Sequence, residues 1–89
     1  MAEVKKKASA GTLESSDVYV EIEPSAAGLT IELQSVVQAQ FGDAIEAAVR
    51  EVLLENGVEC AKVRVMDRGA LECVIRARVE TAVLRSKEG

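Results

Sequence analysis

The spacing of aliphatic residues along this chain switches between two periods, and this switch restricts the possible folds more than any other feature. Between about residues 18 and 34 they alternate with polar residues, which is typical of strands buried on one face. Between about residues 41 and 53 they recur every three or four positions, which is typical of an amphipathic helix. Because the chain has 89 residues, both patterns must share one small domain and one core.

Three alternating runs predict strands. Residues 18–23 read Val-Tyr-Val-Glu-Ile-Glu, and residues 29–34 read Leu-Thr-Ile-Glu-Leu-Gln. The five-residue loop between them, Pro24-Ser-Ala-Ala-Gly28, predicts an antiparallel hairpin. A third strand is predicted around residues 62–65, where the polar side chains are basic and those of the hairpin are acidic. Neighbouring strands can pair such charges, at about 0.2–1 kcal/mol for each pair.

Two segments are predicted to be helical. The first runs from about Asp43 to Asn56, with Asp43 as the N-cap and the Asn56-Gly57 pair as the stop. The second, from about Ala70 to Arg85, fits both a strand and a helix by periodicity. We predict a helix, because a pattern of about 16 residues is long for a strand. Its content of Ala, Leu, Arg and Glu favours the same interpretation.

These elements predict an α+β fold: a small two-layer domain of order β-β-α-β-α, with a three-stranded sheet and two helices on one face. Residues 1–17 are polar, rich in small residues and without periodicity, so we expect a flexible N-terminal arm there. Residues 18–89 then form the folded domain. The core must be aliphatic, because Tyr19 and Phe41 are the aromatic residues of the chain.

The composition excludes several partners. A net charge of −4 repels phosphate backbones, and two aromatic residues make no stacking platform, so we expect no nucleic-acid partner. No apolar run approaches the roughly 20 residues that span a bilayer, so we expect no membrane association. The basic cluster Lys5-Lys-Lys7 lacks the apolar stretch of a signal peptide, so we expect a cytoplasmic location.

Residues suited to catalysis or metal binding are scarce. The chain has no histidine, and most acid–base and nucleophilic sites that work near neutral pH use imidazole. Cys60 and Cys73 are interpreted as free structural thiols, since two thiols without histidine leave a zinc site short of ligands. Arg76, Arg78 and Arg85 could dock an anion or an acidic partner, but salt bridges along an amphipathic helix are the favoured interpretation. We therefore expect no catalytic residue and no metal site.

Two adjacent serines, Ser15 and Ser16, lie in the polar segment Gly11-Thr-Leu-Glu-Ser-Ser-Asp17. On residue chemistry alone, a turn or capping segment is the favoured interpretation, because Ser and Asp bond to nearby backbone groups. A serine nucleophile also needs an activating base, and no histidine is present. An exposed serine needs no internal base, however, if another enzyme modifies it.

Three segments carry a resemblance to a known family. They are Gly11-Thr-Leu-Glu-Ser-Ser-Asp-Val18, Gln40-Phe-Gly-Asp43, and Asp67-Arg-Gly-Ala-Leu-Glu-Cys-Val-Ile-Arg-Ala-Arg-Val79. In this order and spacing, the chain resembles the citrate lyase acyl carrier proteins, the gamma subunits of that complex. The resemblance covers nearly the whole chain apart from the first several residues.

The resemblance implies a site and a function. It implies that Ser15 carries a phosphoribosyl dephospho-coenzyme A group through a phosphodiester, with Ser16 as a neighbour that positions the arm. It implies that this group holds acetyl and citryl thioesters while citrate is cleaved to acetate and oxaloacetate. The implied partners are the citrate lyase alpha and beta subunits, a prosthetic-group transferase and an acetylating ligase.

Other functions remain open on the sequence. A carrier of the malonate decarboxylase type uses a related cofactor, although the Glu-Ser-Ser-Asp and Ala-Leu-Glu-Cys blocks favour citrate lyase. An unmodified interaction domain would use the same helices and strands merely to dock a partner. A small enzyme using Lys and Glu has only generic composition in its favour. The intact mass after expression with the loading enzymes separates a carrier from a docking module.

Overall fold

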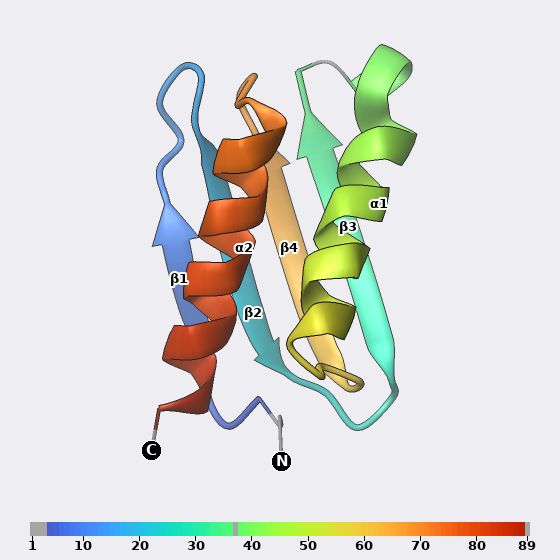
Figure 1. The fold of residues 1–89 in the computed structure, drawn as a ribbon, viewed down its shortest axis with the longest axis vertical. Coiled ribbons are helices and arrows are strands. Elements are labelled where there is room, and N and C mark those ends of the chain that lie inside the picture. The colour runs from blue at the N-terminus through green and yellow to red at the C-terminus, as the bar shows by residue number, and fades with distance from the viewer. Residues whose placement is uncertain (1–3, 37, 89) are drawn as a thin grey trace.

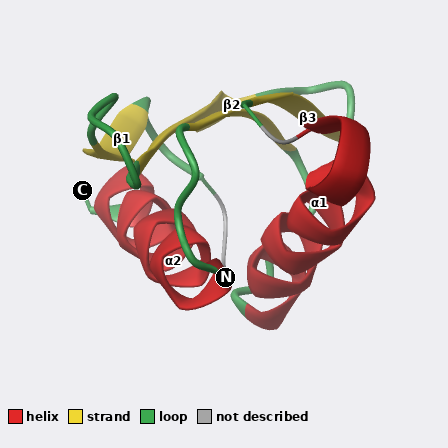
Figure 2. Cartoon of the chain, turned by 90° about the horizontal axis from the view of Figure 1, so that it is seen from above, coloured by secondary structure: helices red, strands yellow, loops and turns green. Residues whose placement is uncertain are grey.

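The computed structural model describes residues 4–36 and 38–88, and it shows a two-layer domain in which both helices lie on one face of a sheet (Figures 1 and 2). The elements in chain order are β1 (Ala8–Gly11), β2 (Val18–Pro24), β3 (Leu29–Ser35), α1 (Gln38–Glu55), β4 (Ala61–Asp67) and α2 (Glu72–Lys87). The predicted α+β class and the two helices on one face are confirmed. The predicted three-stranded sheet is wrong, because the sheet has four strands in the order β1-β2-β4-β3.

The predicted hairpin between the second and third strands is also wrong. Strand β4 lies between them, antiparallel to β2 and parallel to β3. The parallel pair is possible because α1 crosses from the end of β3 back to the start of β4 (Figure 1). A five-residue loop permits a hairpin but does not enforce one, and strand pairing also depends on which side chains become neighbours.

Charge on the outer face of the sheet explains the position of β4. Glu21 of β2 and Glu32 of β3 both lie directly across from Arg64 of β4. The Arg64 guanidinium is 3.8 Å from a carboxylate oxygen of each. Pairing β2 with β3 would instead bring two acidic rows together, and like charges on adjacent strands are destabilising. The predicted charge pairing is therefore confirmed, with β4 as the strand that both acidic strands contact.

Strand β1 lies within residues 1–17, where no strand was predicted. It pairs antiparallel with β2, and its residue Ala10 is buried. Upstream, Val4 is buried, and the backbone N–H groups of Lys5 and Lys6 donate to the Ser86 carbonyl oxygen of α2 at 2.9 and 3.1 Å. The segment was missed because its residues are small, and none is of the β-branched or aromatic type that predicts a strand. The free edge of β2 supplies its partner.

The helical interpretation of the last element is confirmed, since α2 covers Glu72–Lys87. The start of α1 was predicted too late. The helix begins at Gln38, so Asp43 lies inside it and is not its N-cap. The predicted stop is confirmed, because the helix ends before Asn56 and Gly57 has a φ of 72°, a conformation that suits glycine.

The core is aliphatic, as predicted. Valines on the inner face of β2 and β4 pack against both helices, and the fully buried contributors include Val20, Val63, Val49, Leu53, Val79 and Val83. Phe41 is 53% exposed, and Tyr19 is half-buried on the sheet. Both cysteines are free thiols, in agreement with the sequence interpretation. Within residues 4–36 and 38–88, no helix is long and apolar enough to cross a membrane.

The end of β1 depends on a glycine. Gly11 has a φ of 88°, and a Cβ atom there would collide with the Val18 carbonyl oxygen. Gly28 has a similar φ of 91°, but a Cβ atom at that position would have open space for 4 Å around it.

We expect Gly28→Ala to lower the free energy of unfolding by about 1 kcal/mol, the cost of the backbone conformation alone. We expect Gly11→Ala to lower it by about 2–4 kcal/mol, because a backbone clash is added. Urea unfolding curves of both variants measure the difference, and equal losses would contradict the clash.

Candidate functional site

Ser15 and Ser16 lie in the loop that joins β1 to β2, at the end of the domain where β4 stops and α2 begins (Figure 1). Both residues are exposed. In the described part of the chain, neither hydroxyl has a hydrogen-bond partner. The loop therefore presents two hydroxyls to solvent, and neither is activated by a neighbouring base.

The two serines occupy the corner of a β-turn. The Asp17 backbone N–H donates to the Glu14 carbonyl oxygen at 3.2 Å, which places Ser15 and Ser16 at the two central positions. Ser16 has a φ of 65°, whereas Ser15 is not among the residues with positive φ. A positive φ at the second central position alone is the pattern of a type II turn, which favours glycine or asparagine there. Ser15 and Ser16 therefore differ in backbone conformation, although their side-chain chemistry is the same.

Backbone hydrogen bonds fix this turn to the loop between β4 and α2. The Ser16 N–H donates to the Arg68 carbonyl oxygen at 2.8 Å, and the Arg68 N–H donates to the Asp17 carbonyl oxygen at 2.9 Å. These bonds continue the pairing of β2 with β4 beyond its last register pair, Val18 with Asp67. The turn is therefore hydrogen-bonded to the residue that follows β4, the strand paired on both edges.

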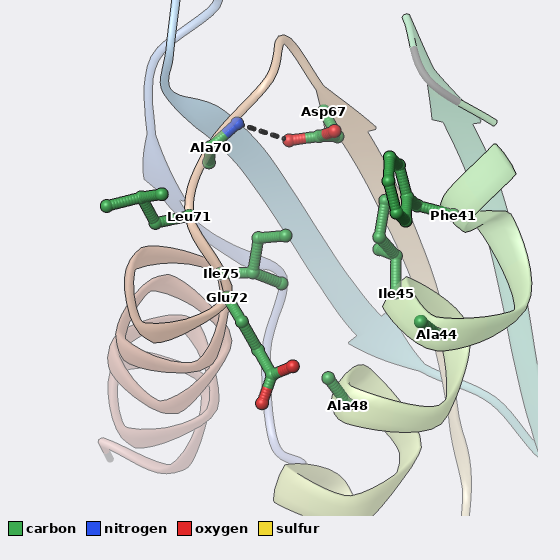
Figure 3. Close-up of a pocket in the computed structure, with 9 residues that line it drawn as sticks. All are labelled: Phe41, Ala44, Ile45, Ala48, Asp67, Ala70, Leu71, Glu72 and Ile75. Atoms are coloured by element: carbon green, nitrogen blue, oxygen red, sulfur yellow. Dashed lines mark hydrogen bonds between the residues drawn. The ribbon is translucent and has the colours of Figure 1, made fainter.

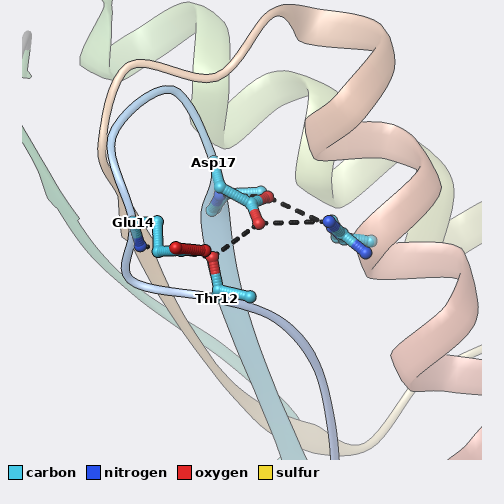
Figure 4. A network of polar contacts seen from close by, with 5 residues as sticks. Thr12, Glu14 and Asp17 are labelled. Atoms are coloured by element: carbon cyan, nitrogen blue, oxygen red, sulfur yellow. Dashed lines mark hydrogen bonds and ion pairs between the residues drawn. The ribbon is translucent and has the colours of Figure 1, made fainter.

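The Asp17 carboxylate fixes the turn from its other side (Figure 4). It accepts hydrogen bonds from the Thr12 hydroxyl at 2.7 Å and from the Val18 backbone N–H at 2.7 Å. The Arg78 guanidinium of α2 donates to both carboxylate oxygens, at 3.2 and 3.1 Å. The Thr12 hydroxyl is the largest cause that lowers the pKa of Asp17, from 3.8 to about 2, and the Val18 N–H is the next. Burial opposes them, and Arg78 lowers the pKa further.

The arginines of α2 have partners within the domain. Arg76 lies 3.0 Å from Glu72 and 3.1 Å from Glu51 of α1, and Arg78 pairs with Asp17. Arg85 donates to the Ser9 carbonyl oxygen of β1 at 2.8 Å. The interpretation of Arg76 and Arg78 as salt-bridge residues is confirmed, while Arg85 bonds to backbone.

A groove of about 240 Å³ lies between the first turns of α1 and α2, near the same end of the domain (Figure 3). Its walls are mostly apolar and include Phe41, Ile45 and Ile75. Asp67 reaches it, but that carboxylate accepts hydrogen bonds from the Ser35 hydroxyl at 2.8 Å and the Ala70 N–H at 2.9 Å. Asp67 thus ties β3 to the β4–α2 loop. Across the described residues, no group of three or more His, Cys, Asp and Glu side chains could hold a metal ion.

Two residues that contact the serine turn were not predicted from the sequence. Arg78 pairs with Asp17 across 61 positions, and Arg68 meets Ser16 across a pair of loops. Both arginines fall in the block 67–79 that carried part of the family resemblance. Residues 11–18 and 67–79 resemble the same family, and this was the available signal that the two segments belong to one site.

Comparisons with known proteins agree with this geometry. A family model described as "ACP: Malonate decarboxylase delta subunit (MdcD)" matches residues 5–86. Citrate lyase acyl carrier protein 2 of Salmonella paratyphi A is 58% identical over 84 residues, which cover 93% of this chain and 87% of that protein. The citrate lyase acyl carrier protein of Escherichia fergusonii is 56% identical over 87 residues, covering 97% of this chain and 90% of that protein.

A solved structure supports the fold. A chain in the crystal structure of a Pseudomonas malonate decarboxylase hetero-tetramer in complex with malonate superposes with a TM-score of 0.80. It is 23% identical, and the match covers 93% of this chain and 86% of that one. At this identity the likeness concerns the fold alone.

Together, the anchored serine turn and these matches define an acyl carrier protein, a subunit that is not itself catalytic. The chain belongs to the citrate lyase acyl carrier protein family. The rival interpretation, a malonate decarboxylase carrier, is supported by the family model and by the fold. The citrate lyase carriers are 56–58% identical to this chain, which favours the citrate lyase family.

The lowered pKa of Asp17 predicts a pH dependence of stability. Because the pKa in the folded protein is about 2 and the ordinary value is 3.8, the ionised carboxylate stabilises the fold above about pH 4. This contribution is lost as the pH falls from about 4 to about 2. We expect Asp17→Asn to lower the melting temperature at pH 7, with a difference from the parent protein that shrinks toward pH 2.

Thr12→Val is the matched variant, because the Thr12 hydroxyl is the largest cause of the lowered pKa. We expect it to reduce the acid dependence of stability without removing the carboxylate. Melting curves from pH 7 to pH 2 measure both variants. If the difference in melting temperature between Asp17→Asn and the parent stayed constant from pH 7 to pH 2, the lowered pKa of Asp17 would be contradicted.

Proposed function

We propose that Ser15 is the attachment point of a phosphoribosyl dephospho-coenzyme A group, joined through a phosphodiester. In this proposal the chain carries acetyl and citryl thioesters on that group while citrate lyase cleaves citrate to acetate and oxaloacetate. The observation that carries the proposal is the exposed Ser15 hydroxyl on a turn fixed by Arg68 and Arg78, in a chain of the citrate lyase carrier family. The bound group supplies the thiol that holds the acyl unit.

The residues around Ser15 fit this role. The hydroxyl is exposed and has no partner within the described residues, so a modifying enzyme can reach it without breaking a contact. Asp17 is held by Thr12 and Arg78, which keeps the backbone on one side of the serine in place. Ser16 is held by its N–H and has a strained φ of 65°. Ser15 therefore offers a free hydroxyl on a fixed backbone, and Ser16 shapes the turn.

Partners follow from the carrier role. The chain is an acyl carrier subunit of citrate lyase. We propose that the alpha subunit exchanges citrate for acetate on the carried thioester, and that the beta subunit releases oxaloacetate and restores the acetyl thioester. A transferase attaches the group and a ligase acetylates it, in the cytoplasm. A tether raises the effective concentration of the acyl unit at each partner site, which suits a group that must visit several of them.

The choice of serine can be tested by variants chosen for the turn. Ser15→Ala removes the proposed hydroxyl. Ser16→Gly removes the other hydroxyl and places at that φ the residue that tolerates it, so the turn is kept. After expression with the loading enzymes, we expect the nucleotide-sized adduct on the parent and Ser16→Gly proteins and none on Ser15→Ala, by intact mass and peptide mapping. An adduct mapped to Ser16, or normal loading of Ser15→Ala, would overturn the assignment.

The same mass measurement separates the other candidates. A parent protein that gains no adduct is an interaction domain, and the carrier proposal then fails. The loaded protein can also be mixed with the partner subunits of each complex. If it then supports malonate decarboxylation but not citrate cleavage, the chain is a carrier of the malonate decarboxylase type.

We also predict that the loaded, acetylated carrier alone does not turn over citrate. The groove carboxylate of Asp67 is engaged by Ser35 and Ala70, and the chain has no histidine to act as an acid or base. Coupled detection of oxaloacetate should give a signal only when both partner subunits are added. Citrate turnover by the pure carrier at a rate proportional to its concentration would refute the non-catalytic role.

A further inference from the structure

One arginine of the chain differs from the others. Five arginines have a side-chain bond to a carboxylate or a carbonyl oxygen: Arg50, Arg64, Arg76, Arg78 and Arg85. Arg68 is exposed, and within the residues that the structure describes its guanidinium has no partner. An unpaired guanidinium is a strong donor for an anion, because its two parallel N–H groups match phosphate oxygens.

The backbone places Arg68 beside the serine turn. Its carbonyl oxygen accepts from the Ser16 N–H at 2.8 Å, and its own N–H donates to the Asp17 carbonyl oxygen at 2.9 Å. Arg68 lines a hollow at the end of the sheet together with Leu13, which belongs to the same loop as Ser15. The residue is therefore held opposite the turn by two bonds that do not involve its side chain, and the guanidinium stays available.

The charges around Ser15 leave this arginine as the unmatched cation. Glu14 and Asp17 flank the two serines. The charge of Asp17 is matched by Arg78 at 3.1 Å. The Glu14 carboxylate has no partner within the described ranges. A phosphodiester on Ser15 adds another negative charge to this acidic segment, and Arg68 is the neighbouring cation with no internal partner.

We propose that Arg68 binds the phosphodiester attached to Ser15 and sets the direction in which the attached group leaves the domain. This rests on the proposed function, because it requires a group on Ser15. Arg68 is then a positioning residue, since it contacts the linkage and not the acyl unit. The pair is solvent-exposed, so salt weakens it.

The test uses the loaded carrier and nuclear magnetic resonance. Mass spectrometry first establishes loading on Ser15 for the parent, Arg68→Gln, Arg68→Lys and Arg50→Gln proteins. Arg50 is the matched control, because it is an exposed arginine on α1 paired with Glu46. The phosphorus resonances then report the environment of the phosphodiester, and the two pyrophosphate phosphorus atoms of the same group serve as an internal reference. The side-chain Nε–H resonance of Arg68 reports the other member of the pair.

We expect the Arg68 Nε–H resonance of the parent to shift between the unloaded and loaded states, while that of Arg50 does not. We expect the phosphodiester phosphorus resonance to move with added NaCl in the parent and Arg50→Gln proteins, and to be insensitive to NaCl in Arg68→Gln. Arg68→Lys should fall between them, because it keeps the charge and loses the paired donors.

Failures of the two proposals have different signatures. A parent protein without an adduct overturns the function proposed for Ser15, and this inference with it. A loaded parent whose Arg68 resonance is unchanged on loading overturns the inference alone. A shift of Arg68 accompanied by changes confined to the pyrophosphate resonances in Arg68→Gln also overturns it, because the arginine would then bind further along the group. The comparison of loaded and unloaded parent protein does not depend on the folding of any variant.

Discussion

Strand β4 is paired along both of its edges, and the arrangement of the rest of the domain depends on that pairing. Its outward Arg64 lies between Glu21 and Glu32, and its inward Val63 and Val65 lie in the core beneath both helices. The acidic strands are kept apart because the basic strand separates them. The consequence for the site is direct, because β4 ends at Asp67 and the next residue pairs with the serine turn. The central strand thus determines where the exposed hydroxyls lie.

The site joins parts of the chain that are distant in sequence. The serine turn receives backbone bonds from the β4–α2 loop and an ion pair from α2. The Asp17 carboxylate accepts hydrogen bonds from Thr12, Val18 and Arg78, which is why its pKa lies well below the ordinary range. None of these contacts activates a serine as a nucleophile. They hold a loop in place while leaving its hydroxyls free, which is the requirement for a substrate of another enzyme and differs from that for a catalytic residue.

The sequence predicted those parts of the fold whose periodicity reports burial. Alternation located β2, β3 and β4, and length separated helix from strand in α2. It missed β1, whose Ala-Ser-Ala-Gly residues are small and include no β-branched or aromatic residue. It began α1 too late because Asp43 resembles a cap, although the helix extends back to Gln38. It also chose the wrong neighbour for β2, although the opposite charges of the strands were already visible. The exposure of Ser15 was predictable from its polar surroundings. The Asp17–Arg78 contact depends on tertiary packing, so local pattern could not reveal it.

The bonds on either side of the serine turn have a mechanical consequence. If the loop were flexible, the position of an attached group would depend on two motions: that of the loop and that of the group itself. Here the tip is clamped to the sheet by Arg68 and to α2 through Asp17, so the protein contributes a fixed pivot. The radius of travel of anything joined at Ser15 is then set by its own rotatable bonds and by the direction in which it leaves the surface. Lengthening the protein loop would move the attachment point. The distance that the acyl unit can travel from that point would still be set by the length of the attached group.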